Sequence, residues 1–342
     1  MSYYCTLDDL NEILKNLIRM NHSSSRKLRI SIEGNIASGK TTIIKYLKEV
    51  VENSNRSNQT SSKSMYDYDL NENSAEINLV DSCLLFNQRV NVKIIPEPVD
   101  LWRNLNGTNL LDLMYKDPHR WALAFHSYVQ LTMLENHLRL NEKPSPAQQQ
   151  HQQCVLSPKA SNQMGVQSPT KTLLSPSKYN KANLENQSPI KASPIKSSSE
   201  PFNINIMERS LFSARYCFVE NLYRCNVLQS VEYEILDKWF NWMTEAHDCN
   251  LDVIFYLKTN PQTCLQRLNK RGRSEETSTV SLDYLQKIND LHEEWLGENS
   301  FKLNNRDYYK PPKIIVIDAD QSIDDVYKSM ELETRNSIAM RV

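Results

Sequence analysis

Short apolar runs alternate with amphipathic segments along most of the chain. The apolar runs are rich in β-branched residues and are bounded by polar ones, which predicts strands. They lie at residues 28–33, 92–95, 204–207, 251–257 and 314–317. Helical spacing of apolar residues follows the first run and also marks residues 118–140 and 212–219. Because few polar positions interrupt the strands, we expect an α/β fold with a five-stranded parallel sheet that helices cover on both faces.

Both ends of the chain are predicted to be helical. The N-terminal segment has one apolar face, formed by Leu10, Ile13, Leu14 and Leu17. Asp8 or Asp9 can cap that helix. We therefore expect an N-terminal helical extension at residues 1–27, one α/β domain at 28–320 and a C-terminal helical tail at 321–342.

Two polar segments interrupt the domain. Residues 53–91 are rich in Asn, Ser and Asp and are predicted to be an inserted loop. Residues 141–201 contain eight of the 14 prolines and neither Trp nor Phe, so this segment is predicted to be disordered. Its Ser-Pro sites resemble targets of a proline-directed protein kinase, an expected partner. They lie at Ser157, Ser168, Ser175, Ser188 and Ser193.

Charge and cysteine content exclude several classes of protein. The 40 Lys+Arg and 41 Asp+Glu give a net charge of −1, so we expect no nucleic-acid partner. The seven cysteines include no C-x-x-C pair, which favours a reduced intracellular protein. The apolar runs are too short to cross a membrane. Asp8, Asp9 and Glu12 argue against a mitochondrial presequence. A cytoplasmic location is expected, and mitochondrial and nuclear locations stay open.

A glycine-containing loop follows the first expected strand and leads into a helix. Its sequence, Gly34-Asn-Ile-Ala-Ser-Gly-Lys-Thr41, fits the pattern G-x-x-x-x-G-K-[ST]. Backbone amides of such a loop hold phosphates, Lys40 reaches the β- and γ-phosphates, and the Thr41 hydroxyl ligates Mg²⁺. The loop predicts that a nucleoside triphosphate is bound. The expected phosphate-binding residues are Gly34, Asn35, Ile36, Ala37, Ser38, Gly39, Lys40, Thr41 and Thr42.

Four further motifs occur in order along the chain. They are Pro96-Glu-Pro-Val-Asp-Leu-Trp102, Asn109-Leu-Leu-Asp-Leu-Met-Tyr115, Glu208-Arg-Ser-Leu-Phe-Ser-Ala-Arg-Tyr-Cys-Phe218 and Arg271-Gly-Arg-Ser-Glu-Glu276. Together with the phosphate loop they resemble the deoxyribonucleoside kinases, in particular the branch of thymidine kinase 2 and the insect multisubstrate kinases. The resemblance implies a P-loop kinase domain with a helical lid. It also implies a homodimer that uses ATP and Mg²⁺ to phosphorylate the 5′-hydroxyl of deoxyribonucleosides in nucleotide salvage.

The same resemblance implies roles for charged and polar residues. Glu97 follows a strand at the edge where a parallel sheet presents its site, and it matches the base that acts on the 5′-hydroxyl. Arg209 matches the arginine that holds the 5′-oxygen and the transferring phosphate, so Glu97, Arg209 and Lys40 form the expected catalytic set. Tyr115 and Glu276 match residues that hold the sugar 3′-hydroxyl. The expected lid arginines, which close over the ATP phosphates, are Arg267, Arg271 and Arg273.

The nucleobase is expected in an apolar slot. Residues that match this slot are Trp102, Met114, Val129, Met133 and Phe218. Val129, Met133 and Ala214 together match the pattern of family members that accept pyrimidines, thymidine included. The sequence departs from the family at His126, where a Gln is expected. An imidazole is expected to reach the base with one nitrogen, so one hydrogen bond to the base is lost unless water or Gln130 compensates. Protonation of His126 is then expected to change the base preference between about pH 6 and 8.

Two alternative functions stay open at this point. A thymidylate-type nucleoside monophosphate kinase needs a further cation near the acceptor phosphate, which Glu97 would repel. A catalytically weakened nucleotide-binding regulatory protein could dock through its Ser-Pro segment. The intact set of Lys40, Thr41, Glu97 and Arg209 argues against that second alternative.

Overall fold

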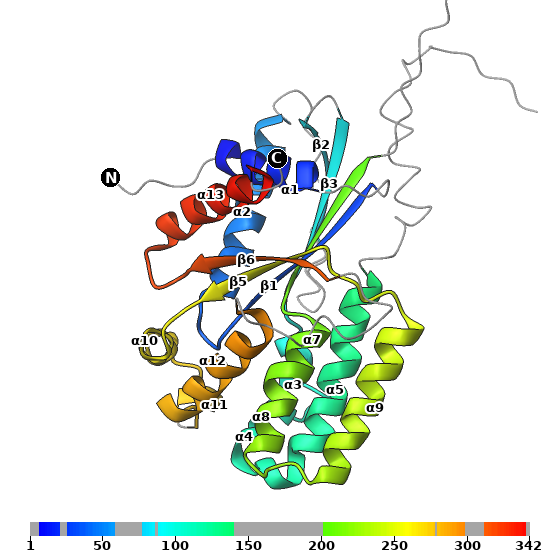
Figure 1. Ribbon diagram of the computed structural model, residues 1–342, viewed down its shortest axis with the longest axis vertical. Coiled ribbons are helices and arrows are strands. Elements are labelled where there is room, and N and C mark those ends of the chain that lie inside the picture. Colours follow the sequence, from blue (N-terminus) through cyan, green and yellow to red (C-terminus); the bar gives the residue numbers. More distant parts are fainter. Residues whose placement is uncertain are drawn as a thin grey trace, which may run out of the picture. The chain divides into compact units, whose positions relative to one another are not determined.

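The computed structural model describes residues 7–20, 26–58, 77–85, 88–139, 201–277, 279–297 and 311–339 (Figure 1). The strands are β1 (Lys27–Gly34), β2 (Ile77–Leu85), β3 (Gln88–Ile95), β4 (Phe202–Glu208), β5 (Val253–Lys258) and β6 (Lys313–Asp318). The helices are α1 (Leu7–Met20), α2 (Lys40–Asn58), α3 (Val99–Arg103), α4 (Leu110–Lys116), α5 (Pro118–Arg139), α7 (Leu211–Ser213), η1 (Ala214–Val219), α8 (Glu220–Arg224), α9 (Ser230–Ala246), α10 (Pro261–Arg271), α11 (Ser274–Thr277), α12 (Leu282–Leu296) and α13 (Ile323–Ala339). The segment predicted to be disordered, 141–201, lies outside the described residues except for Pro201.

The strands form one sheet in the order β2-β3-β4-β1-β5-β6. The five strands from β3 to β6 in this order run parallel, which confirms the predicted parallel sheet. Ile30 on the central strand β1 lies opposite Ile206 on β4 and Val253 on β5. The apolar runs are therefore buried between neighbouring strands as well as beneath helices, which explains their low polar content.

The prediction of an inserted loop at residues 53–91 is wrong at both ends of that segment. Helix α2 continues to Asn58, and β2 pairs antiparallel with β3, which itself begins at Gln88. Within this polar segment the stretch that forms β2 is itself mostly apolar, with Ile77, Leu79, Val80, Leu84 and Leu85, so the composition of the whole segment concealed an edge strand that pairs with β3. Residues 59–76 lie outside the described part of the chain.

Helices cover both faces of the sheet because the strand residues alternate between two cores. Phe255 packs on one face with residues of α1, α2 and α13, and these three helices lie together on one side of the sheet in Figure 1. Ile254 packs on the other face with residues of α5, η1, α9 and α12. Leu14 and Leu17 of α1 belong to the first core. The boundary expected at residue 27 therefore does not separate α1 from the domain. Among the described helices, none is long and apolar enough to span a membrane.

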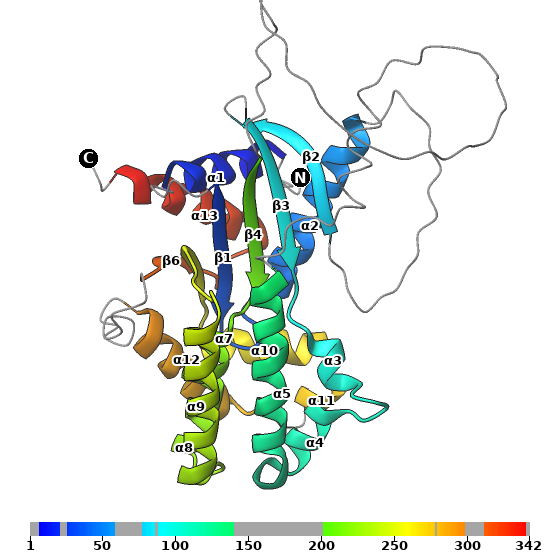
Figure 2. The same ribbon diagram turned by 90° about the vertical axis from the view of Figure 1, so that its right-hand side faces the viewer.

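The carboxyl ends of β1, β3 and β4 lie side by side and point toward α5 and α7 (Figure 2). The phosphate loop follows β1, Glu97 follows β3 and Arg209 follows β4. This is the edge at which open parallel sheets bind ligands. After β4 and the short α7 the chain enters η1, a π-helical turn, and such turns are frequent at functional sites.

Candidate active site at the carboxyl edge of the sheet

A cavity of about 870 Å³ opens at this edge. The phosphate loop and helices α10 and α11 line one part of it, and α3, α4, α5 and η1 line the other. Of the site residues predicted from the sequence, all except Gly34 and Asn35 line this cavity. The structure thus brings the expected phosphate, sugar and base positions into one continuous space.

Gly34 and Asn35 shape the phosphate loop from beneath. A Cβ atom at Gly34 would lie 2.7 Å from the carbonyl oxygen of Leu257, and the φ of Gly34 is +143°, so a larger residue would clash with β5. The Asn35 amide donates to the carbonyl of Leu285 on α12 at 2.8 Å, and its side-chain oxygen accepts from the Ile36 amide at 2.8 Å. These two residues fix the loop and do not face the cavity.

Lys40 is held against the loop that precedes it. Its Nζ donates to the carbonyls of Gly34 at 2.9 Å and Asn35 at 2.5 Å and to the Ser38 hydroxyl at 3.2 Å. Burial, together with the positive charge of Arg209, lowers the pKa of Lys40 to about 7. A buried ammonium whose hydrogen bonds all go to neutral oxygens is stabilised by an anion, so the site favours a bound phosphate group.

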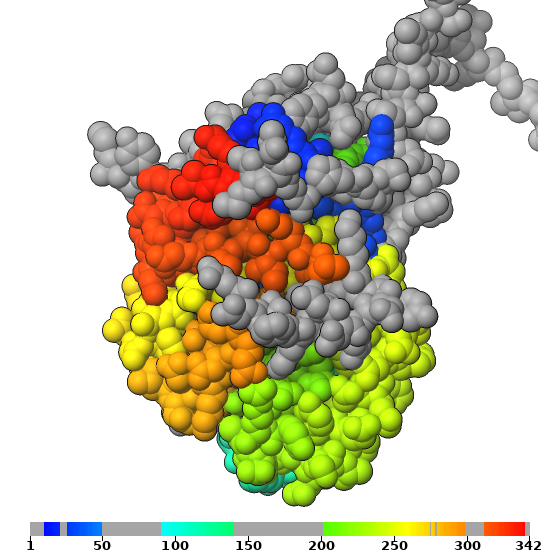
Figure 3. Space-filling view, viewed as in Figure 1, coloured from blue at the N-terminus to red at the C-terminus, as the bar shows by residue number. Residues whose placement is uncertain are grey.

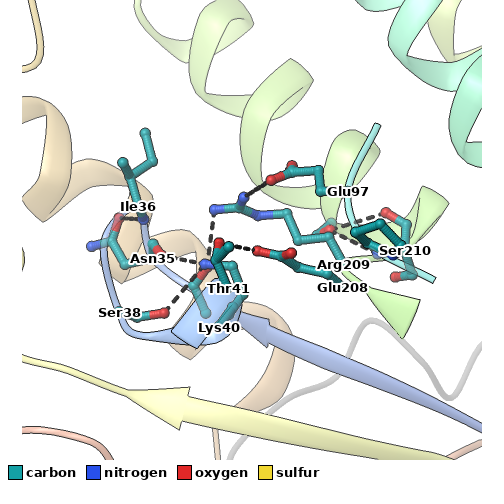
Figure 4. Close-up of polar contacts among 12 residues, drawn as sticks. Asn35, Ile36, Ser38, Lys40, Thr41, Glu97, Glu208, Arg209 and Ser210 are labelled. Carbon is teal, nitrogen blue, oxygen red and sulfur yellow. Dashed lines mark hydrogen bonds and ion pairs between the residues drawn. The ribbon is translucent and has the colours of Figure 1, made fainter. Parts of the chain in front are cut away.

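Thr41, in the first turn of α2, contacts Glu208 at the end of β4 (Figure 4). The Thr41 hydroxyl donates to Glu208 Oε1 at 2.5 Å. Burial and the nearby charge of Glu97 raise the pKa of Glu208, and a cation between these oxygens would relieve both effects. Mg²⁺ takes oxygen ligands and combines one or two protein groups with phosphate oxygens and waters. Thr41 and Glu208 therefore fit a magnesium ion that is bound together with a nucleotide.

Glu97 and Arg209, which both line the cavity, form a largely buried ion pair (Figure 4). Arg209 Nη1 donates to both carboxylate oxygens of Glu97, at 2.9 and 2.8 Å, and Nη2 donates to the Gly34 carbonyl at 3.3 Å. Burial alone would lower the pKa of Arg209, but the charges of Glu97 and Glu208 raise it. The Arg209 guanidinium thus links Glu97, the candidate proton acceptor, to the phosphate loop.

The expected lid lies at the junction of α10 and α11. Gly272 ends α10 with a φ of +67°, which turns the chain into the short α11. Arg271 and Arg273 both pair with Glu276, the latter at 3.2 Å. Arg267 Nη1 donates to the Ser38 carbonyl of the phosphate loop at 3.5 Å. The carboxylate that was expected at the sugar is therefore bound by two lid arginines here.

Helix α3 fixes one wall of the apolar slot. The Trp102 indole donates to the Thr132 hydroxyl on α5 at 2.9 Å and packs edge-on against Phe125, with ring centres 5.8 Å apart. The next residue, Arg103, pairs with Glu275 of α11 at 2.8 Å. The orientation of the indole ring is thus set by two contacts within the protein, which leaves a flat apolar wall beside the cavity.

His126 lines the cavity, but its predicted titration is wrong. The side chain is 3% exposed, and its Nδ1 has no hydrogen-bond partner among the described atoms. Burial lowers the pKa of His126 to about 3. The imidazole is therefore neutral between pH 6 and 8, because desolvation, which the sequence does not reveal, disfavours its charged form.

Gln130 does not replace the missing amide. Its Nε2 donates to the carbonyl of Leu236 on α9 at 3.2 Å, and the residue is not part of the cavity lining. Gln130 lies one helical turn after His126, but its side chain packs in the contact between α5 and α9. Gln130 is therefore not placed to compensate at the base, which removes one of the two alternatives.

Sequence reasoning missed several residues of the site. The further polar residues that line the cavity include Lys45, Glu208, Ser210, Ser213, Lys270, Tyr284, Gln321 and Ser322. Glu208 and Ser210 flank Arg209 at the end of β4. The principle that ligands bind at the carboxyl ends of parallel strands could therefore have identified them as well. Gln321 and Ser322 follow β6 and offered no comparable motif.

Comparisons with known proteins agree with this geometry. A family model described as deoxynucleoside kinase matches residues 80–157 and 177–338. Mitochondrial thymidine kinase 2 of Homo sapiens is 31% identical over 306 residues, which cover 90% of this chain and 76% of that protein. Deoxycytidine kinase of Homo sapiens is 27% identical over 324 residues, covering 90% and 89%. A probable deoxycytidine kinase of Fowlpox virus is 29% identical over 297 residues, covering 87% and 81%.

Proposed function

The chain belongs to the deoxynucleoside kinase family, and we propose that it transfers the γ-phosphoryl group of ATP to the 5′-hydroxyl of a deoxyribonucleoside. One observation carries this function: a single cavity joins the phosphate loop, the Glu97–Arg209 pair and an apolar slot. The relatives named as thymidine and deoxycytidine kinases support a role in nucleotide salvage.

The residues of the chain divide the chemistry between them. Glu97 accepts the proton of the attacking hydroxyl. Arg209 holds the 5′-oxygen and the transferring phosphoryl group, while Lys40 and the loop amides stabilise charge on the β- and γ-phosphates. Arg271 and Arg273 add positive charge from the lid. Thr41 and Glu208 would hold Mg²⁺, which would supply positive charge to the phosphate oxygens.

A phosphorylation assay tests this function. The full chain is incubated with ATP and Mg²⁺ and with each of the four deoxyribonucleosides, the matching ribonucleosides and thymidine monophosphate. We expect deoxyribonucleoside 5′-monophosphates as the main products, with pyrimidines favoured, and loss of turnover when EDTA removes the metal. Thymidine monophosphate is expected to be inert because the Glu97 carboxylate repels an acceptor phosphate. Turnover of that compound alone would favour the nucleotide kinase, and no turnover at all would favour the regulatory protein.

His126 is expected to limit discrimination among bases. A neutral imidazole offers fewer hydrogen bonds to a base edge than an amide, so His126→Gln should raise pyrimidine kcat/KM by up to about tenfold. Because the pKa of His126 is lowered to about 3, the ratio of thymidine to deoxycytidine efficiency should stay constant from pH 6 to 8 in both proteins. Steady-state kinetics over this pH range provide the check. A ratio that changes with pH in the His126 protein alone would contradict the buried, neutral imidazole.

We also propose that the protein is a homodimer, because α9 exposes an apolar stripe. Val231, Ile235, Trp239 and Trp242 are 64%, 41%, 50% and 53% exposed, while Leu236 and Phe240 of the same helix are fully buried. The exposed residues recur at helical spacing and thus share one side of α9. Helices α8 and α9, coloured green to yellow-green, form part of the outer surface in Figure 3. A stripe of this kind favours burial against a second copy.

Replacing Trp239 and Trp242 together by Glu is expected to yield a monomer, since two charges would have to be buried in the interface. Light scattering after size exclusion measures the mass. Leu332→Glu is the matched control, because Leu332 on α13 is 53% exposed and lies on another helix. A dimer that survives the double change, or a wild-type monomer, would refute the proposed interface.

The Ser-Pro sites and the location of the protein are proposals that rest on sequence alone. We propose that a proline-directed protein kinase phosphorylates the sites, which lie outside the described residues, and that the protein is cytoplasmic. Phosphate incorporation into the full chain, compared with a variant carrying Ala at all five serines, tests the first proposal. Cell fractionation tests the second.

A further inference from the structure

Three consecutive residues at the carboxyl end of β1 hold the segment that carries Arg209. The Ile32 carbonyl accepts a hydrogen bond from the Arg209 backbone amide at 3.0 Å. The Glu33 carboxylate accepts one from the Ser210 hydroxyl at 2.5 Å. The Gly34 carbonyl accepts one from Arg209 Nη2 at 3.3 Å. The strand thus contacts Arg209 at its backbone, at its side chain and through the residue that follows it.

Glu33 has an unusual environment for a carboxylate. Its side chain is 0% exposed, and no described lysine or arginine lies within ion-pair distance of it. Oε2 has no hydrogen-bond partner among the described atoms, and Oε1 accepts from the Ser210 hydroxyl. Burial raises the pKa of Glu33 to about 7, although hydrogen bonds from Ser210 and Ser213 and the charges of Arg209 and Lys40 act in the opposite direction. Burying a carboxyl group is costly, whereas apolar residues such as Ile30 and Ile32 of the same strand are buried without that cost.

The reason is found in the backbone of Arg209. Its φ is +59°, in the left-handed region that residues with a side chain rarely adopt. Ser210 returns at once to an extended conformation and precedes α7 as its N-cap. This change from a left-handed to an extended conformation is a joint that persists only where contacts hold the residues on both sides of it. Ile32 holds the near side through the Arg209 amide, and Glu33 holds the far side through Ser210.

This joint determines where the guanidinium lies. Arg209 Nη1 binds both oxygens of Glu97, so a change in the Arg209 backbone would displace the Glu97 carboxylate, the candidate proton acceptor. Phosphoryl transfer depends on in-line placement of the groups around the transferring phosphate, and small displacements of those groups reduce turnover strongly. Binding of the nucleoside depends mainly on the apolar slot, which Glu33 does not line.

We propose that Glu33 is a positioning residue for phosphoryl transfer, which holds Ser210 and thereby fixes Arg209 in the left-handed conformation that aligns Glu97. This inference rests on the proposed kinase function. It assigns to Glu33 no contact with the substrate.

Variants at Glu33 separate the hydrogen bond from the charge. Glu33→Gln keeps an acceptor oxygen for Ser210, and we expect its kcat to stay within about threefold of the natural protein. Glu33→Met keeps the size and loses the acceptor, and we expect kcat to fall at least about tenfold while nucleoside KM changes by less than about threefold. Ser31→Ala is the control, because Ser31 is buried on the same strand two residues earlier and its hydroxyl has no described partner. Its kcat should not change.

A double-mutant cycle tests the route through Ser210. Ser210→Ala should lower kcat about as much as Glu33→Met, and the two changes together should cost no more than one of them. Losses that multiply, equal losses in the Gln and Met variants, or full turnover of the Met variant would each overturn the proposal. If Glu33→Met does not fold, Ser210→Ala still tests the proposal, because it removes the other partner of the same hydrogen bond.

Crystal structures of the Glu33→Met and Ser31→Ala proteins give a readout that does not depend on activity. We expect the Arg209–Glu97 pair to be broken or displaced in the Met variant and intact in the Ala variant. An intact pair with left-handed Arg209 in the Met variant would overturn the positioning role. If the natural protein phosphorylated no nucleoside, the proposed function would fail on its own, and the structures would still decide what Glu33 holds.

Discussion

Replacing Glu97 by glutamine is expected to lower kcat by about 10²-fold or more with little loss of nucleoside binding. The amide keeps the size of the side chain and one acceptor for Arg209, but it cannot take the proton of the 5′-hydroxyl. Because Arg209 now holds both carboxylate oxygens at 2.8–2.9 Å, the variant also loses part of this ion pair. Single-turnover kinetics and calorimetric binding of thymidine separate the two quantities.

Glu293→Gln provides the control for that change. Glu293 lies on α12 outside the cavity and accepts hydrogen bonds from Tyr256 and Lys258. Its replacement alters a more exposed ion pair away from the reacting atoms, so kcat should remain within about twofold of the natural value. Full turnover of Glu97→Gln would eliminate Glu97 as the base, and an equal loss in both variants would point to stability and not chemistry.

Replacing Lys40 by methionine is expected to reduce kcat/KM by about 10²–10³-fold or more. The ammonium is the charged group that the phosphate loop itself supplies, and Met fills nearly the same volume without a charge. The thermal unfolding temperature should stay the same or rise, because the variant no longer buries an ammonium whose contacts are all with uncharged oxygens. The opposite directions of the two effects distinguish a functional lysine from a structural one.

Lys287→Met is the matched control for this experiment. Lys287 is an exposed residue of α12 that pairs with Asp283 at 2.7 Å, far from the phosphate loop in the sequence and outside the cavity lining. Its replacement should change neither kcat/KM nor the unfolding temperature appreciably. A Lys40 variant that retains activity, or that loses stability together with activity, would contradict the role assigned to Lys40.

The positions of the candidate site could be predicted because each motif is attached to a strand end. Gly34 follows β1, Glu97 follows β3 and Arg209 follows β4, and parallel strands deliver their carboxyl ends to one edge. The resemblance to a known family then supplied the residue roles. Neither source indicated which partners these side chains would take. Glu276 was expected at the sugar, yet it pairs with Arg271 and Arg273.

The edge of the sheet was harder to predict than its centre. The central strands are apolar enough to stand out from the surrounding sequence, as Ile30 and its neighbours show. Strand β2 has an apolar run of its own, with Ile77, Leu79, Val80, Leu84 and Leu85, but the surrounding sequence is rich in Asn, Ser and Asp. Composition averaged over the whole segment therefore concealed the strand, and its pairing with β3 identifies it.

The sequence by itself determined the five parallel strands, the phosphate loop and most of the predicted residues that gather at the carboxyl edge. These features depend on local spacing. The periodicity of apolar residues distinguishes a helix from a strand, and the residues that follow a parallel strand lie at the carboxyl edge of the sheet. Only the tertiary structure decided the state of the side chains. Desolvation lowers the pKa of His126 to about 3, and the contact that fixes Glu33 comes from Ser210, a residue of another strand end. Burial and partner choice depend on what lies nearby in space, and distant parts of the chain supply those neighbours.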